Sequence, residues 1–268
     1  MADTRFIYGF HAVVAKLRHS ASDVREIFID QTRQDARARD LIKLAQIHGV
    51  HLILSEPARI AAMAGGGGGK QARHQGVVAR VAAQVRALKL DDILDTLAEP
   101  ALLLVLDGVQ DPHNLGACLR VADAAGAHAV IAPKDRACGL NATAIKVASG
   151  AAESVPFITV TNLARTLREL REREVLTVGA DSDADSELYA IEQTGPLAWV
   201  LGAEGEGLRR LTRETCDRLA RIPMQGSVAS LNVSVASGIC LYEARRQRSL
   251  ALAAGPPRGE GSVRHGAA

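Results

Sequence analysis

Short apolar runs alternate with helical patterns along most of the chain. In the second half the runs are nearly continuous, and each is followed by a segment with helical spacing. They cover residues 102–106, 129–132, 157–160, 176–178, 197–201 and 219–222. Apolar strands separated by helices are typical of a parallel sheet that is covered on both faces. The pattern therefore predicts an α/β domain.

The N-terminal part has a smaller pattern of the same kind. Helices are predicted over 11–18 and 35–48, and strands over 26–30, 50–55 and 76–81. Together they predict a small α/β domain over residues 1–82. It contains a run of glycines from Gly65 to Gly69, which we expect to form a mobile loop. This run is not a phosphate-binding P-loop, because Ala64 and Gln71 stand where that motif needs Gly and Ser or Thr.

The boundaries of the second domain follow from changes in composition. Residues 83–100 carry several acidic side chains and end at Pro100, so we interpret them as a linker with one or two helical turns at most. The second domain covers 101–249 and ends in a helix that starts near Leu231. Residues 250–268 have no periodicity and are predicted to be a disordered tail. The final helix carries an apolar stripe, made of Leu231, Val235, Ile239 and Tyr242.

Composition narrows the class of protein. Of the 268 residues, 47% are hydrophobic and 23% are charged, as in ordinary globular proteins. The longest uninterrupted apolar run is 101–106, far below the about 20 residues that a membrane-spanning helix needs. The N-terminus has no signal-peptide pattern, so we expect a cytoplasmic protein without membrane contact. The cysteines have no metal-binding or redox spacing and are expected to be buried reduced thiols: Cys118, Cys138, Cys216 and Cys240.

Charge is unevenly distributed. Residues 1–90 hold 14 Lys and Arg against 7 Asp and Glu, a net +7, and the remainder holds 18 against 23, a net −5. A positive N-terminal region suits a polyanionic partner such as RNA. An equally good interpretation is a set of solvated helix faces, because Arg33, Arg37 and Arg39 lie among polar and acidic residues.

Polar residues gather after three of the predicted strands, where α/β proteins bind ligands. After the first, Asn114 is predicted to cap the following helix, and Arg120 to lie in its second turn. After the second, Glu204 lies among glycines. It occupies the place of the middle glycine of a Rossmann fingerprint, which argues against a dinucleotide. After the third, Ser230 is predicted to cap the last helix, with Asn232 in the first turn.

These segments read LDGVQDPHNLGACLR at 106–120, GAEGEG at 202–207 and IPMQGSVASLNVSV at 222–235. In this order they resemble the three signature motifs of the SpoU, or TrmH, group of the SPOUT methyltransferases. YGFHA at 8–12 and HQGVV at 74–78 are similar to that group's small RNA-binding domain, which resembles a ribosomal protein. The likeness thus covers nearly the whole chain, and is strongest to members that methylate guanosine in large-subunit ribosomal RNA.

The resemblance implies a fold, a cofactor and a partner. The fold is a parallel-sheet domain with a C-terminal trefoil knot, in a homodimer, and the cofactor is S-adenosylmethionine. By the same likeness the catalytic residues are Asn114, Arg120, Glu204, Ser230 and Asn232. Cofactor-binding residues are Gly202, Ile222, Met224, Leu231 and Asn232, and no metal is implied. The Gly65 to Gly69 run departs from the family's short polar loop, although Lys70 and Arg73 there are candidate phosphate contacts.

The implied reaction transfers a methyl group from a sulfonium to a ribose 2′-oxygen. The enzyme must align the two reactants and accept the hydroxyl proton. In the family the base is the arginine that matches Arg120, yet a guanidinium normally stays protonated. Two roles for Arg120 are therefore open: it takes the proton itself, or it stays charged and holds a phosphate that accepts the proton. Alternatives to an rRNA substrate are the same reaction on tRNA, and a non-catalytic RNA-binding or assembly factor.

Overall fold

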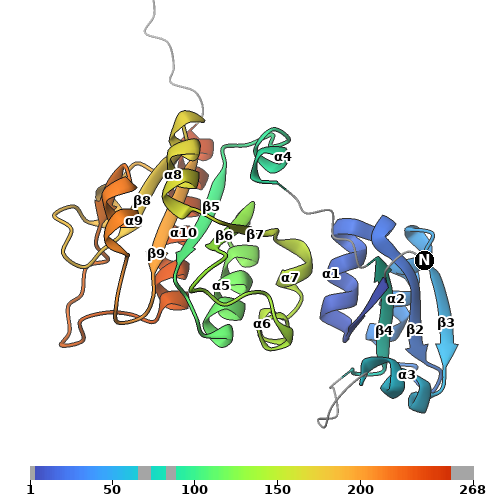
Figure 1. Ribbon diagram of the computed structural model, residues 1–268. Helices are drawn as coiled ribbons and strands as arrows, with labels where there is room; N and C mark the ends of the chain where they lie inside the picture. Colours follow the sequence, from blue (N-terminus) through green and yellow to red (C-terminus); the bar gives the residue numbers. More distant parts are fainter. Residues whose placement is uncertain (1–3, 66–73, 83–88, 255–268) are drawn as a thin grey trace, which may run out of the picture.

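The computed structural model describes residues 4–65, 74–82 and 89–254 (Figure 1). The run Gly65 to Gly69, with Lys70 and Arg73, lies outside these residues apart from Gly65, and so do 255–268 of the predicted tail. No helix of the described segments is long and apolar enough to cross a membrane.

The N-terminal domain is an α/β unit, as predicted. Its sheet has the order β1-β4-β2-β3, in which β2 and β3 are parallel and β4 runs antiparallel to both of its neighbours. Helices α1 and α2 cover one face around Leu17, Ile27 and Leu41, and α3 covers Phe28 and Val78 on the other. The elements are β1 (Thr4–Tyr8), α1 (Phe10–Ser20), β2 (Val24–Asp30), α2 (Ala36–Ile47), β3 (His51–Ser55), α3 (Pro57–Ala64) and β4 (Val77–Ala82).

Two of these elements, β1 and α3, were not predicted from the sequence. Strand β1 is a five-residue edge strand, and its residues pair with residues of β4 that lie 70 to 78 positions further along the chain. Helix α3 has eight residues and buries only Ile60 fully. Both are short, and their partners come from the tertiary structure, so local periodicity is a weak guide to them.

The C-terminal domain is a parallel sheet with helices on both faces, which confirms the predicted class. The strand order is β10-β8-β9-β5-β6-β7, with parallel pairing throughout. Side chains of α5 and α10 pack on one face, and those of α4 and α8 pack on the other. The trefoil knot stays a prediction. The strands are β5 (Leu102–Asp107), β6 (Ala129–Pro133), β7 (Phe157–Val160), β8 (Leu176–Ala180), β9 (Leu197–Gly202) and β10 (Arg218–Ala220).

Helices connect these strands and also occupy part of the predicted linker. In the linker, α4 (Leu90–Leu94) forms the short helical stretch that was expected there. The others are α5 (Pro112–Ala124), α6 (Ala142–Ala148), α7 (Ala151–Ser154), α8 (Leu163–Glu172), α9 (Arg210–Thr215) and α10 (Val233–Ala254), with short 3-10 turns at Ala21–Asp23 and Leu188–Ala190.

Helix α10 differs from its prediction in two ways. It continues to Ala254, so residues 250–254, which were assigned to the disordered tail, are helical. Part of its apolar stripe also does not face the core: Val235 and Tyr242 are 50% and 53% exposed, whereas Ile239 packs against the core. The buried face instead carries smaller residues such as Ser237, Cys240 and Ala244. The periodicity was real, but two of its four residues, Val235 and Tyr242, lie on a surface that the described residues leave exposed.

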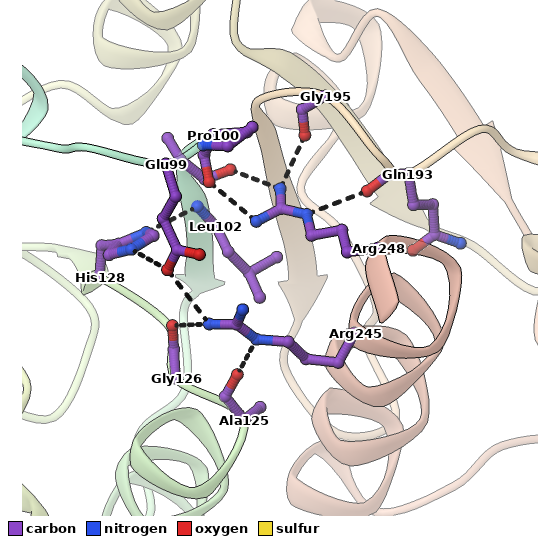
Figure 2. A network of polar contacts seen from close by, with 11 residues as sticks. Glu99, Pro100, Leu102, Ala125, Gly126, His128, Gln193, Gly195, Arg245 and Arg248 are labelled. Atoms are coloured by element: carbon purple, nitrogen blue, oxygen red, sulfur yellow. Dashed lines mark hydrogen bonds and ion pairs between the residues drawn. The ribbon is translucent and has the colours of Figure 1, made fainter. Parts of the chain in front are cut away.

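The C-terminal half of α10 is anchored by a buried arginine (Figure 2). Arg248 is 7% exposed and donates to the carbonyl oxygens of Pro100, Ala101, Gln193 and Gly195 at 2.7–3.2 Å. These carbonyls precede β5 and β9, so one side chain ties the last helix to the starts of two central strands. Nearby, Arg245 donates to the carbonyl oxygen of Gly126 at 2.7 Å and also to that of Ala125.

The two domains touch through α1 and α7, which lie beside each other (Figure 1). Arg5 donates to both carboxylate oxygens of Glu153 at 3.0 Å, and only 3% of the Glu153 side chain is exposed. Gly150 has a φ of +100°, and a Cβ at this residue would lie 2.9 Å from the carbonyl oxygen of His11. Glycine at 150 thus permits the close approach of the two backbones.

Candidate active site

Three polar side chains from distant parts of the sequence meet at the carboxyl end of the parallel sheet. Asn232 donates through Nδ2 to Oδ1 of Asn114 at 2.9 Å and to Oε2 of Glu204 at 3.4 Å. Asn114 donates through its own Nδ2 to the same Oε2 at 3.2 Å. Strands β5 and β9 are neighbours in register, from Leu102 with Leu197 to Asp107 with Gly202, so the loops that follow them emerge side by side. The sheet therefore brings these residues together.

The helix caps differ from those predicted: Asn114 is not a cap, and Asn232 is one. Helix α5 is capped by Asp111, whose carboxylate accepts from the backbone N–H of His113 at 2.9 Å. Asn114 therefore lies inside the first turn, and Arg120 lies beyond the second turn. Asn232, rather than Ser230, caps α10: its Oδ1 accepts from the backbone N–H of Ser234 at 2.9 Å and from its hydroxyl at 2.6 Å. This fixes the Asn232 amide with Nδ2 directed at Asn114 and Glu204.

Glycines shape the segment that carries Glu204. Gly205 and Gly207 have φ values of +82° and +67°, in the left-handed region that favours glycine. The segment folds back on itself, and the Gly207 N–H donates to the carbonyl oxygen of Ala203 at 2.9 Å. A Cβ at Gly202 would lie 2.0 Å from the carbonyl carbon of Gly207. Other residues at 202 would therefore push the returning chain outward.

A cavity of about 510 Å³ opens beside this segment. Of the residues predicted to bind a cofactor, Gly202, Ile222, Met224 and Leu231 line the cavity, while Asn232 lies in the polar cluster next to it. Ser230 and Glu204 also line the cavity. Its lining comes from residues 180–183, 201–208 and 229–231, together with Arg213, Ile222, Met224, Val233 and Ala236. A flat, uncharged ring system and a short polar chain match such walls.

Acidic side chains outnumber basic ones in the cavity lining. Asp181, Asp183, Glu204 and Glu206 line it, with Arg213 as the basic residue that the described lining contains. Arg213 is paired with Asp181 at 2.5 Å. The negative charge of this lining favours a cationic ligand and disfavours a pyrophosphate. Sequence analysis missed Asp181 and Asp183. Both follow β8, a strand next to β9, and this position in the sequence could have identified them.

Arg120 is not part of this cluster. It is exposed on α5, it does not line the cavity, and no hydrogen bond or ion pair in the described parts of the chain joins it to Asn114, Glu204 or Asn232. Asn114 and Arg120 are six residues apart on one helix, which places their side chains on different faces. Within one chain the structure therefore brings together four of the five predicted catalytic residues in one region, and leaves Arg120 outside it.

The cysteines form no disulfide, and the described residues contain no group of His, Cys, Asp and Glu that would hold a metal ion. Cys118 and Cys240 are buried, whereas Cys138 and Cys216 are only half-buried, so the expected burial is wrong for these two. Burial raises the pKa of the Cys118 thiol to about 11 and that of Cys216 to about 12. None of the four lines the cavity.

Comparison with known proteins identifies the family. The model of the SpoU rRNA Methylase family matches residues 101–242, and the model named RNA 2'-O ribose methyltransferase substrate binding matches residues 6–85. The chain belongs to the SpoU rRNA methylase family. The matched methylase region holds every member of the polar cluster and the cavity walls.

Curated SpoU relatives match almost the full chain. The 23S rRNA (guanosine-2'-O-)-methyltransferase RlmB of Ralstonia nicotianae is 60% identical over 250 residues, which cover 93% of this chain and 98% of the relative. RlmB of Escherichia coli is 55% identical and covers 92% of this chain and 100% of its own length. Among solved structures, the SpoU methyltransferase AviRb from Streptomyces viridochromogenes in complex with AdoMet has a TM-score of 0.71 at 27% identity, covering 91% of this chain and 90% of AviRb.

Proposed function

We propose that the protein transfers a methyl group from S-adenosylmethionine to the ribose 2′-hydroxyl of a guanosine in 23S ribosomal RNA. The observation that carries the proposal is the convergence of Asn114, Glu204 and Asn232 beside a glycine-walled cavity. The relatives called RlmB, with 52–60% identity in several bacteria, support the substrate class. An rRNA substrate supports the expected cytoplasmic location.

The cavity fits S-adenosylmethionine in size and in charge. Backbone without Cβ atoms at Gly202, Gly205 and Gly207 lets a ligand approach the main chain closely. Ile222, Met224 and Leu231 offer apolar surface for an adenine ring, and the acidic lining suits the positive sulfonium and amino groups. The cofactor supplies an activated methyl group whose leaving group becomes neutral, so no acid is needed on that side.

The polar cluster is suited to aligning the attacking ribose. Glu204 Oε2 accepts from both asparagine amides, while its other carboxylate oxygen makes no hydrogen bond with the described residues. That oxygen can accept a bond from a substrate hydroxyl or from an exocyclic amine. Ser230, exposed at the cavity wall, adds a hydroxyl donor. Alignment of this kind is worth up to about 7 to 11 kcal/mol in favourable reactions.

We further propose that the enzyme is a homodimer whose second copy supplies Arg120. Val235 and Tyr242 on α10 form an exposed apolar surface that a second copy would cover. Arg120 lies on α5, the helix that packs against α10. A copy docked on this pair of helices would carry its own Arg120 towards the cavity of its partner. There Arg120 would contact the phosphate or the hydroxyl of the bound RNA.

The reaction is tested by incubating the purified protein with methyl-labelled S-adenosylmethionine and either 23S rRNA or total tRNA. Ribose methylation is mapped by its resistance to alkaline cleavage. Label at one 23S guanosine is the expected result. Label in tRNA alone would keep the chemistry but contradict the substrate, and cofactor binding without label in either RNA or in ribosomal precursors would contradict catalysis.

The dimer is tested by light scattering and by mixing two inactive variants. Tyr242→Glu is expected to give monomers. Arg120→Ala and Asn114→Ala should each be inactive, whereas their mixture should regain up to about a quarter of wild-type activity, because half of random dimers are mixed and each has one intact site. A mixture that stays inactive, although the subunits exchange, would show that both residues act from the same chain.

A further inference from the structure

A buried carboxylate lies directly behind the segment that carries Glu204. Asp107 is the last residue of β5, and its side chain is completely buried. Oδ2 of Asp107 accepts from the backbone N–H of Arg209 at 3.0 Å, and Oδ1 accepts from Nε of Arg209 at 2.6 Å. A second guanidinium nitrogen of Arg209 forms an ion pair with the same Oδ1. The Arg209 side chain is 41% exposed, so the ion pair links a buried residue of the sheet with a residue at the protein surface.

Asp107 contacts both ends of the segment 203–208. On one side it is the register partner of Gly202, where β9 ends. On the other side its carboxylate holds Arg209, the residue at which the segment ends. Between these points the chain contains two glycines, Gly205 and Gly207, which have many conformations open to them in the unfolded state. Because Asp107 fixes both ends of the segment, the segment can adopt fewer conformations. The hydrogen bond from the Gly207 N–H to the carbonyl oxygen of Ala203 restricts it further.

We propose that Asp107 and Arg209 are positioning residues that hold Glu204 and the cavity wall formed by 203–208 in the arrangement that binds S-adenosylmethionine. The proposal rests on the proposed function. Every residue from Ala203 to Leu208 lines the cavity, so a displacement of the segment changes cofactor binding and the place of Glu204 together. Neither Asp107 nor Arg209 lines the cavity itself, and both act through the segment between them.

A second carboxylate, next to an outer strand of the same sheet, offers a control. Asp217 accepts from the backbone N–H of Thr177 at 2.8 Å, from the Thr177 hydroxyl at 2.7 Å, and from Arg171. Its pattern of one backbone donor and one arginine resembles that of Asp107. It connects β8 with the chain before β10, however, and is not part of the cavity lining. Loss of Asp217 therefore removes a similar set of bonds without releasing 203–208.

The experiment compares Asp107→Asn, Arg209→Gln and the control Asp217→Asn with the wild type. Calorimetry gives the Kd for S-adenosylmethionine, steady-state assays give kcat and the KM for RNA, and hydrogen exchange reports the mobility of residues 203–208. For Asp107→Asn and Arg209→Gln we expect about a tenfold to hundredfold rise in the cofactor Kd together with a lower kcat, because small misplacements have effects of this size. Exchange at 203–208 should be faster, and the KM for RNA unchanged.

Asp217→Asn should lower the melting temperature while leaving the cofactor Kd and exchange at 203–208 unchanged. Arg209→Lys, which keeps the charge but not the fork of donors, should fall between wild type and Arg209→Gln. Should the buried Asp107→Asn variant fail to fold, Arg209→Gln carries the test, since its side chain reaches solvent.

The inference would be overturned if folded Arg209→Gln bound the cofactor with wild-type affinity and showed wild-type exchange at 203–208. It would also be overturned if Asp217→Asn changed cofactor affinity and exchange as much as Arg209→Gln does. A wild-type protein that binds cofactor but methylates no RNA would contradict the proposed function alone, because the binding and exchange measurements still compare the variants.

Discussion

Asn232 donates a hydrogen bond from Nδ2 to Oδ1 of Asn114 at 2.9 Å, across 118 positions of sequence. The direction of this bond is set by the backbone, since Oδ1 of Asn232 is already occupied by the N–H of Ser234. The Nδ2 of Asn114 must then face Glu204. One helix cap therefore determines the orientation of two amides and of the carboxylate between them.

This chain of bonds predicts a pH-dependent defect in Asn114→Asp. The substitution places a second carboxylate beside Glu204, and the repulsion raises the pKa of one of them. We expect kcat to fall about 10²- to 10³-fold at pH 8, the range seen when one preorganised donor is removed, and to recover partly near pH 6. The check is the ratio of variant to wild-type kcat across pH. Asn114→Ala is the control, for which this ratio should stay low and flat, and a flat ratio for both variants would contradict the prediction.

Arg120 is predicted to act as a charged group rather than as a base. A guanidinium normally stays protonated, and Arg120 is exposed in the single chain. Arg120→Ala should abolish turnover. Arg120→Lys should retain at most about a tenth of kcat, because it loses bidentate contact with a phosphate, and its pH profile should match that of wild type. High activity with a profile shifted towards the lysine pKa would instead establish proton abstraction by residue 120.

Arg248 is predicted to be essential for stability. Arg248→Met leaves the carbonyl oxygens of Pro100, Ala101, Gln193 and Gly195 without this donor in a buried place. Charge-assisted bonds of this kind suggest a loss of about 3 kcal/mol or more in the free energy of unfolding. Urea titration measures it. Arg165→Met, at the exposed pair with Glu169, is the control and should change stability by less than about 1 kcal/mol. Equal effects of the two variants would refute the assignment.

His128 is predicted to make the fold less stable in mild acid. Its Nδ1 accepts from the backbone N–H of Leu102 at 2.9 Å, and Nε2 pairs with Glu99 at 3.0 Å (Figure 2). Desolvation lowers the pKa of His128 and outweighs the opposing effect of Glu99. The unfolded chain therefore binds this proton more readily, so stability is complete above pH about 6.5 and is lost as the pH falls below that value.

The measurement is the free energy of unfolding at pH 7.5 and pH 5.5. His128→Asn, which keeps an acceptor for Leu102 but does not titrate, should lose less stability over this interval than wild type. The pKa of Glu99 is also lowered, because bonds to His128 and the charge of Arg245 outweigh its desolvation, so Glu99 titrates below this window. An identical loss in the variant would show that His128 does not cause the effect.

The sequence by itself determined the class of fold and pointed to several residues of the candidate site, but not to Asp181 and Asp183. Strands of the parallel sheet are continuous apolar runs, because both faces are buried, and such runs are visible without neighbours. The motifs around Asn114, Glu204 and Asn232 follow strands directly, so their place at one edge of the sheet could be expected.

Only the tertiary structure decided which side chains meet. The caps at Asp111 and Asn232 differ from those predicted, because several residues at each helix start are able to cap and the surrounding contacts select one. Strand order places Asp107 against Gly202, a contact that no local pattern reveals. The stripe on α10 had helical periodicity, yet periodicity does not say whether a face meets the core or another molecule. Contacts between distant residues depend on how the elements pack, and that information is not local.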